Sequence, residues 1–146
     1  MKFRSVLATL FIVIVMMTTV APVALASGTK YGVTISLSEG TLTVFKWKGG
    51  NWLCVDSIHC ISGNPYEPTE KGTFYVSGHK KSYSLDGLHY TYATFLGSKR
   101  NAICAMSKKE RKKLGDIGTM GQVVVSSSKA RWLYHHLPVG TKLVIK

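Results

Sequence analysis

Hydrophobic and polar positions alternate along the chain after residue 30 with the two-residue period of β-strands. Val33, Ile35 and Leu37 alternate with Thr34 and Ser36, a pattern that places every second side chain on one face of a sheet. Further β-rich runs lie between turn-forming residues, and strands are predicted at 33–37, 41–47, 52–62, 73–76, 88–95, 102–106, 122–125 and 141–145. Residues 77–87, which hold Ser, Gly, Lys and Asp, are predicted to form a long loop.

One short helix is predicted near the C-terminus. Ala130, Leu133, Tyr134 and Leu137 follow the spacing i, i+3, i+4, i+7 and form a single apolar stripe. The serines at 126–128 are candidate N-caps, and the Pro and Gly at 138 and 140 stop the helix. Many short strands with one helix predict a mostly β protein, folded as a sandwich.

The first 26 residues have the pattern of a secretory signal peptide. Lys2 and Arg4 precede an apolar run at 6–20, and Ala24 and Ala26 are the small residues before a cut after Ala26. The alternative is an uncleaved membrane anchor, because a spanning helix needs about 20 apolar residues. We expect residues 27–146 to form one exported domain, extracellular or associated with the cell wall. Contact with the membrane is then expected only through the signal sequence, if it is uncleaved.

The charge balance is strongly basic. Nineteen Lys and Arg residues face seven Asp and Glu, for a net charge of +12 over 146 residues. A basic exported protein attracts polyanions, which outside a bacterial cell are wall polymers and anionic lipid surfaces rather than nucleic acid. Five of the basic residues gather in one run: Lys108, Lys109, Arg111, Lys112 and Lys113. This run is either a solvated loop or a contact for an anionic wall polymer.

Three stretches of the mature chain resemble one known family. They are the predicted hairpin at 33–45, the segment Pro-Thr-Glu-Lys-Gly-Thr-Phe at 68–74, and the helix and last strand at 126–145. In order and spacing they resemble the L,D-transpeptidase (YkuD-like) catalytic domain. The resemblance implies an L,D-transpeptidase-like β-sandwich that holds a nucleophilic Cys. That Cys attacks the L,D-amide of a wall tetrapeptide stem and forms a thioester, which an amine or water resolves.

The family motif is a His, then Ser/Thr-His-Gly-Cys, an apolar residue and usually Arg, and here it is degenerate. Alignment without a gap from the helix backwards keeps Thr119 and Gly121 but places Met120 at the second His and Gln122 at the Cys. Fourteen residues, 105–118, separate Thr119 from Cys104, which stands at the first His. The motif-equivalent positions are therefore Cys104, Thr119, Met120, Gly121, Gln122 and Val124, the last in place of Arg.

These substitutions remove the chemistry that the family motif supplies. The carboxamide of Gln122 is a donor and acceptor but no useful nucleophile, Met120 cannot transfer a proton, and Val124 lacks a guanidinium. We expect the site to be inactive. Backbone N–H groups at Gly121 and Gln122 are expected to face the pocket still, where they would bind a carbonyl without turnover.

A displaced nucleophile is the alternative. Cys104 is a candidate, with His89 as its base, although an apolar sequence context is typical of a buried, inert thiol. Cys54 and Cys60 share one predicted strand and lie too far apart to bridge, so at most one disulfide, involving Cys104, is open, and we favour none. The histidines show no ligand spacing, and we expect neither a metal nor a cofactor.

Three hypotheses follow. The first is a non-catalytic wall protein that binds peptidoglycan stem peptide or an anionic wall polymer. The second is an active L,D-transpeptidase that uses an unusual thiol such as Cys104. The third is a structural or partner-binding sandwich without wall-peptide recognition.

Overall fold

The computed structural model describes residues 28–146, so the signal sequence predicted at 1–26 lies outside the described residues. The described chain is mostly β and contains two sheets and two helices. In chain order the elements are β1 (Tyr31–Ser36), β2 (Thr41–Lys48), β3 (Asn51–His59), β4 (Gly72–Tyr75), β5 (Gly78–Leu85), β6 (Leu88–Phe95), β7 (Ala102–Ala105), α2 (Lys108–Leu114), β8 (Val123–Val124), α3 (Ser127–His136) and β9 (Lys142–Ile145). The predicted mostly β fold is confirmed.

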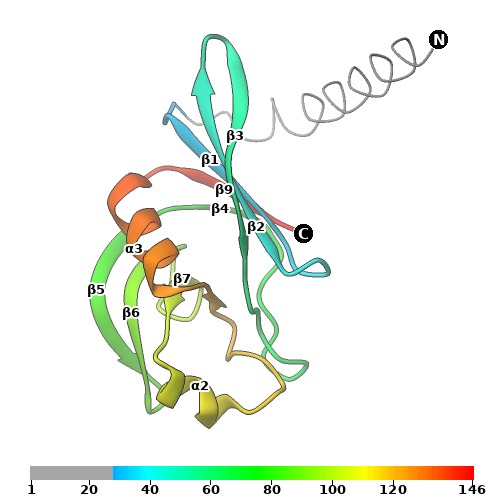
Figure 1. Ribbon diagram of the computed structural model, residues 1–146, viewed down its shortest axis with the longest axis vertical. Helices are drawn as coiled ribbons and strands as arrows, with labels where there is room; N and C mark the ends of the chain where they lie inside the picture. The colour runs from blue at the N-terminus through cyan, green and yellow to red at the C-terminus, as the bar shows by residue number, and fades with distance from the viewer. Residues whose placement is uncertain (1–27) are drawn as a thin grey trace, which may run out of the picture.

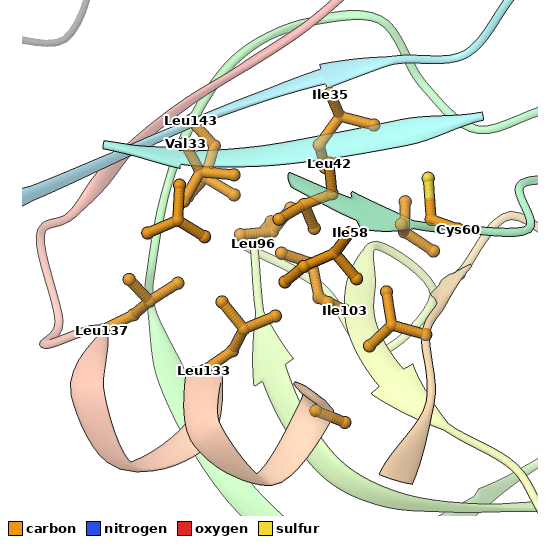
Figure 2. Close-up of a cluster of buried hydrophobic side chains, with 14 of the residues drawn as sticks. Val33, Ile35, Leu42, Ile58, Cys60, Leu96, Ile103, Leu133, Leu137 and Leu143 are labelled. Atoms are coloured by element: carbon orange, nitrogen blue, oxygen red, sulfur yellow. The ribbon is translucent and has the colours of Figure 1, made fainter. Parts of the chain in front are cut away.

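The strands form a five-stranded sheet in the order β3-β2-β1-β9-β4 and a four-stranded sheet in the order β5-β6-β7-β8. β1 pairs in parallel with the last strand, β9, and antiparallel with β2. Hydrophobic side chains from both sheets meet α3 in one core cluster, in which Leu133 of the helix and Leu137 at its C-cap pack against the strands (Figure 2). α3 has the predicted cap, because the hydroxyl of Ser126 accepts a hydrogen bond from the backbone N–H of Lys129.

The predicted loop at 77–87 is wrong: most of it is strand β5, which pairs with β6. The two strands are joined through Asp86 and Gly87, whose φ angles of 52° and 75° are both positive. An Asp-Gly pair with two positive φ angles makes the tight two-residue turn that suits the twist of a hairpin. The polar, exposed face of β5 hid the strand, but the Asp-Gly signal was present in the sequence.

The prediction of a single helix is also wrong, because the basic run forms α2 rather than a loop. The hydroxyl of Ser107 accepts a hydrogen bond from the N–H of Glu110, which lies three residues on, and Gly115 ends the helix with a φ of 67°. A capping Ser followed by a Glu at this spacing is a helix-start signal, and a Gly with positive φ is a common stop. No residue of α2 is buried, so the apolar stripe that reveals a packed helix is missing from the sequence.

Candidate functional site

The motif segment runs from Thr119 to Val124 and enters the four-stranded sheet beside β7. In the parallel pairing of β7 with β8, Ile103 lies opposite Val123 and Cys104 opposite Val124. Because side chains alternate between the faces of a strand, Gln122 shares the face of Cys104 and Val124. The structure thus brings three of the motif-equivalent positions to one face of the sheet.

Gln122 is fully buried, with an exposed fraction of 0%. Within residues 28–146, neither the Nε2 nor the Oε1 atom of its side chain has a hydrogen-bond partner. A buried polar group without a partner costs about 1–3 kcal/mol of stability. The position predicted to correspond to the family's nucleophile therefore holds a carboxamide that the described residues leave without a hydrogen-bond partner.

Thr119 closes the backbone of the motif segment on itself. Its hydroxyl donates to the carbonyl of Gln122 over 2.5 Å and accepts from the N–H of Gly121 over 3.2 Å. The N–H of Gly121, expected to face the pocket, is therefore occupied by a neighbouring side chain. The expectation for Gly121 is therefore wrong, and one backbone N–H fewer is available to bind an incoming carbonyl.

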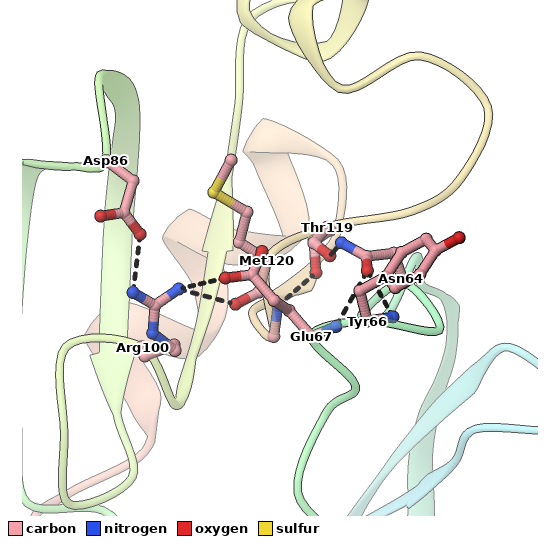
Figure 3. A network of polar contacts seen from close by, with 8 residues as sticks. Asn64, Tyr66, Glu67, Asp86, Arg100, Thr119 and Met120 are labelled. Carbon is pink, nitrogen blue, oxygen red and sulfur yellow. Dashed lines mark hydrogen bonds and ion pairs between the residues drawn. The ribbon is translucent and has the colours of Figure 1, made fainter.

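The loop after β3 holds the motif segment from the other side. The Nδ2 atom of Asn64 donates to the carbonyl of Thr119 over 2.8 Å, and the hydroxyl of Thr69 donates to the carbonyl of Gly121 over 2.9 Å. The Oδ1 atom of Asn64 also accepts from the N–H groups of Tyr66 and Glu67 (Figure 3). The backbone of Tyr66, a residue with 88% of its surface exposed, is thereby fixed to Asn64.

Arg100 reaches the same segment from the loop between β6 and β7, and the sequence did not reveal it. Its guanidinium donates to Asp86 over 2.7 Å, to the carbonyl of Met120 over 3.2 Å and to Glu67 over 3.5 Å (Figure 3). The hydrogen bond with Asp86 raises the pKa of Arg100. The side chain also covers Gly121, where a Cβ would lie 3.3 Å from the Cγ of Arg100. Arg100 and Met120 lie 20 residues apart in the chain, so no local sequence pattern could have predicted their contact.

The proposed pair of Cys104 and His89 is not brought together. Cys104 has no exposed surface and packs in a cluster with Leu88 and Tyr90 of β6. His89 is exposed on the opposite face of that strand, where its Nδ1 atom lies 3.3 Å from the hydroxyl of Ser84. Burial raises the pKa of Cys104 to about 12. A thiol that is protonated and away from a base is a poor nucleophile.

The other two cysteines are also free thiols. Cys54 is exposed, whereas Cys60 is buried, and its burial raises its pKa to about 11.

Throughout residues 28–146, no three His, Cys, Asp or Glu side chains are grouped so that they could hold a metal ion. No helix in that part of the chain is long and apolar enough to cross a membrane.

The five basic residues of α2 are exposed, and one of them, Arg111, lines a pocket that reaches Gly118, the residue before the motif segment. The pocket has a volume of about 430 Å³ and lies between the loop after β3 and the end of α2. Its lining is Ile61, Ser62, Gly63, Arg111, Leu114 and residues 115–118. A second hollow of about 460 Å³ is lined by Lys108, Arg111, Lys112, Gly115 and Asp116. Arg111, Gly115 and Asp116 line both hollows, so the polyanion candidates lie at hollows that end next to the motif segment.

The sequence matches the model of the YkuD L,D-transpeptidase catalytic domain over residues 30–145. The chain belongs to this family. The resemblance given by the three sequence stretches is thereby confirmed over almost the whole described chain. No curated protein matches the sequence.

Several solved structures, L,D-transpeptidases among them, share the fold. A fused Zn-dependent amidase/peptidase/peptidoglycan-binding domain-containing protein from Clostridium acetobutylicum matches 90% of this chain at 21% identity, with a TM-score of 0.70. The L,D-transpeptidase from Stackebrandtia nassauensis matches 88% of this chain at 15% identity, with a TM-score of 0.69. L,D-transpeptidase 1 of Mycobacterium tuberculosis matches 80% of this chain at 18% identity, with a TM-score of 0.62. The matches span 57%, 60% and 61% of those chains. At these identities the likeness concerns the fold alone.

Proposed function

We propose that this L,D-transpeptidase-family domain is an exported, non-catalytic protein that binds peptidoglycan stem peptide in the cell wall. The observation that carries the proposal is the buried carboxamide of Gln122 at the position of the family's nucleophile. A carboxamide cannot form the thioester through which the family's acyl transfer proceeds. The buried, protonated Cys104 offers no substitute beside it.

The pocket beside the motif supports binding of a peptide with charges of both signs. Arg111 and Asp116 both line it, one a cation and the other an anion at neutral pH. A wall stem peptide carries a terminal carboxylate and a free amine, which are complementary to that pair. Leu114 and Ile117 add apolar residues to the lining.

The test uses the full chain, residues 1–146, in a mild detergent with a disaccharide-tetrapeptide. We expect saturable binding by calorimetry, no covalent adduct by intact mass and no released D-Ala. Arg111→Gln is expected to weaken binding about tenfold, which corresponds to the loss of one charge-assisted hydrogen bond. Lys80→Gln, which removes an exposed charge from β5, is the matched control and should bind as the unchanged chain does.

Two results would overturn the proposal in favour of the other hypotheses. An acyl adduct, or D-Ala release that Cys104→Ala abolishes, would show an active L,D-transpeptidase with a displaced thiol. A folded protein that neither binds nor reacts would show a structural or partner-binding sandwich without wall-peptide recognition.

An anionic wall polymer is the second candidate ligand, and the exposure of α2 favours it. Its four lysines and Arg111 are solvent-exposed, and the one ion pair formed within the helix joins Lys113 to Glu110 over 2.9 Å. Three of the basic residues border the 460 Å³ hollow. Phosphate-rich polymers are attracted to such a cluster, and salt weakens the attraction.

A further inference from the structure

We propose that the tip of the β2–β3 hairpin is a contact surface for an anionic lipid bilayer. The hairpin tip comprises residues 46–53, Lys-Trp-Lys-Gly-Gly-Asn-Trp-Leu. The proposal concerns the end of the molecule away from the motif and does not depend on the proposed stem-peptide binding. The hairpin extends beyond the rest of the fold at one end, and α2 lies at the other (Figure 1).

The tip presents large apolar side chains to solvent. Trp47 lies opposite Trp52 in the strand register, and their ring centroids are 5.3 Å apart in an edge-to-face arrangement. Trp47 is 46% exposed and Leu53 48% exposed. Exposed tryptophan at the end of a rigid hairpin fits the boundary between lipid headgroups and acyl chains, where the amphipathic indole ring is favoured.

The charge of the tip has one sign. Lys46 and Lys48 flank Trp47, and residues 41–53 contain no Asp or Glu. The next acidic residue along β3, Asp56, is engaged by Lys129 over 2.5 Å. Lysine side chains can extend to headgroups while the neighbouring rings lie deeper, and anionic lipids attract them. A cationic, aromatic tip therefore complements a negatively charged membrane.

The position at which the chain enters the fold supports the same partner. The N–H of Trp47 donates to the carbonyl of Lys30 over 2.7 Å, and Tyr31 lies opposite Lys46 in the register. The apolar run at 6–20 ends about ten residues before that point, a reach of at most about 35 Å. In the uncleaved chain, a bilayer that holds this run is therefore within reach of the tip, and α2 and the motif would then face away from it.

A second copy of the chain is a weaker fit. A stable interface buries about 800 Å² on each partner, more than a few residues at the end of one hairpin provide. The two-residue turn itself is Gly49-Gly50, which adds no side-chain surface.

The experiment uses the full chain in vesicles of phosphatidylcholine, with or without phosphatidylglycerol, and bilayer-embedded brominated lipid as the quencher. The chain has three tryptophans, which makes fluorescence selective. The variant Trp52→Phe/Trp132→Phe reports on Trp47, and Trp47→Phe/Trp52→Phe reports on Trp132, which packs against Tyr31 and His136. If either double variant fails to fold, Trp132→Phe alone retains both rings of the tip.

We expect brominated lipid to quench Trp47 about twofold or more in the anionic vesicles and to leave Trp132 nearly unchanged. Lys46→Gln/Lys48→Gln should lower the quenching of Trp47, and Lys80→Gln/Lys81→Gln, the matched charge loss on β5, should not. Unquenched Trp47 in a folded, vesicle-bound chain would overturn the proposal. Protection of Trp47 from both lipid and aqueous quenchers, increasing with protein-to-lipid ratio, would instead show a second copy on the tip.

Discussion

At the scale of single residues, Gln122 is the most informative position in the molecule. Its side chain is completely buried and has both polar atoms unpaired among the described residues. The sequence alignment predicts that it stands where the family has its thiol, and the proposed loss of turnover rests on that prediction. Because the unpaired carboxamide should lower the stability of the fold, its burial can be tested by unfolding experiments without knowledge of any ligand.

Replacement of Gln122 by methionine, which has a similar length and no amide, is expected to raise the free energy of unfolding by about 1–2 kcal/mol. Urea unfolding of the two proteins measures the difference. Gln122→Glu is the paired variant and should destabilise the fold, because it places a charge in the same buried position. A Met variant less stable than the original would show that the carboxamide has partners in solution.

The buried thiols predict a loss of stability in alkali. Burial raises the pKa of Cys60 from 9.0 to about 11 and that of Cys104 from 9.0 to about 12. As pH rises above about 9, the unfolded chain loses these protons first, so the folded state is progressively disfavoured. Urea unfolding at pH 8 and at pH 10.5 should show this fall. Cys104→Ala should reduce the pH dependence, and Cys54→Ser, at an exposed thiol, should leave it intact.

At the scale of elements, the loop after β3 matters because it positions the motif segment. Asn64→Ala would remove the donor to Thr119 and the acceptor for the N–H groups of Tyr66 and Glu67. We expect a loss of about 2–3 kcal/mol in unfolding free energy, since buried groups are left unpaired. Asn51→Ala, the same change at the exposed first residue of β3, should cost less than about 0.5 kcal/mol. Equal losses would contradict the anchoring role of Asn64.

Elements were predictable from sequence where one face is buried and much less so where it is not. β1 shows a clear two-residue period because Val33 and Ile35 are fully buried. α3 shows a clear helical period because Ala130 and Leu133 are fully buried. β5 and α2 are largely solvent-exposed, so hydrophobic periodicity is weak there. The sequence signals for these two elements are local. The Asp86-Gly87 turn marks the end of β5, and Ser107 with Glu110 marks the start of α2.

At the scale of the whole molecule, the α2 cluster should dominate binding to anionic polymers. Lys108, Lys109, Lys112 and Lys113 changed together to Gln are expected to weaken binding to teichoic acid about tenfold at low salt, and added salt should weaken the unchanged protein similarly. The matched control removes four exposed lysines elsewhere: Lys71, Lys80, Lys81 and Lys99. Salt-independent binding, or equal losses in both variants, would show that no α2-specific site exists.

The sequence by itself determined the class of fold and the family, and it predicts that the family's catalytic side chains are replaced. Periodicity and motif order are local properties, and the identities of Gln122, Met120 and Cys104 can be read directly. The tertiary structure alone decided that Gln122 is unpaired, that Cys104 and His89 lie on opposite faces, and that Arg100 covers Gly121. These facts depend on contacts between residues far apart in the chain, because burial and hydrogen-bond partners are set when the two sheets and their loops pack together.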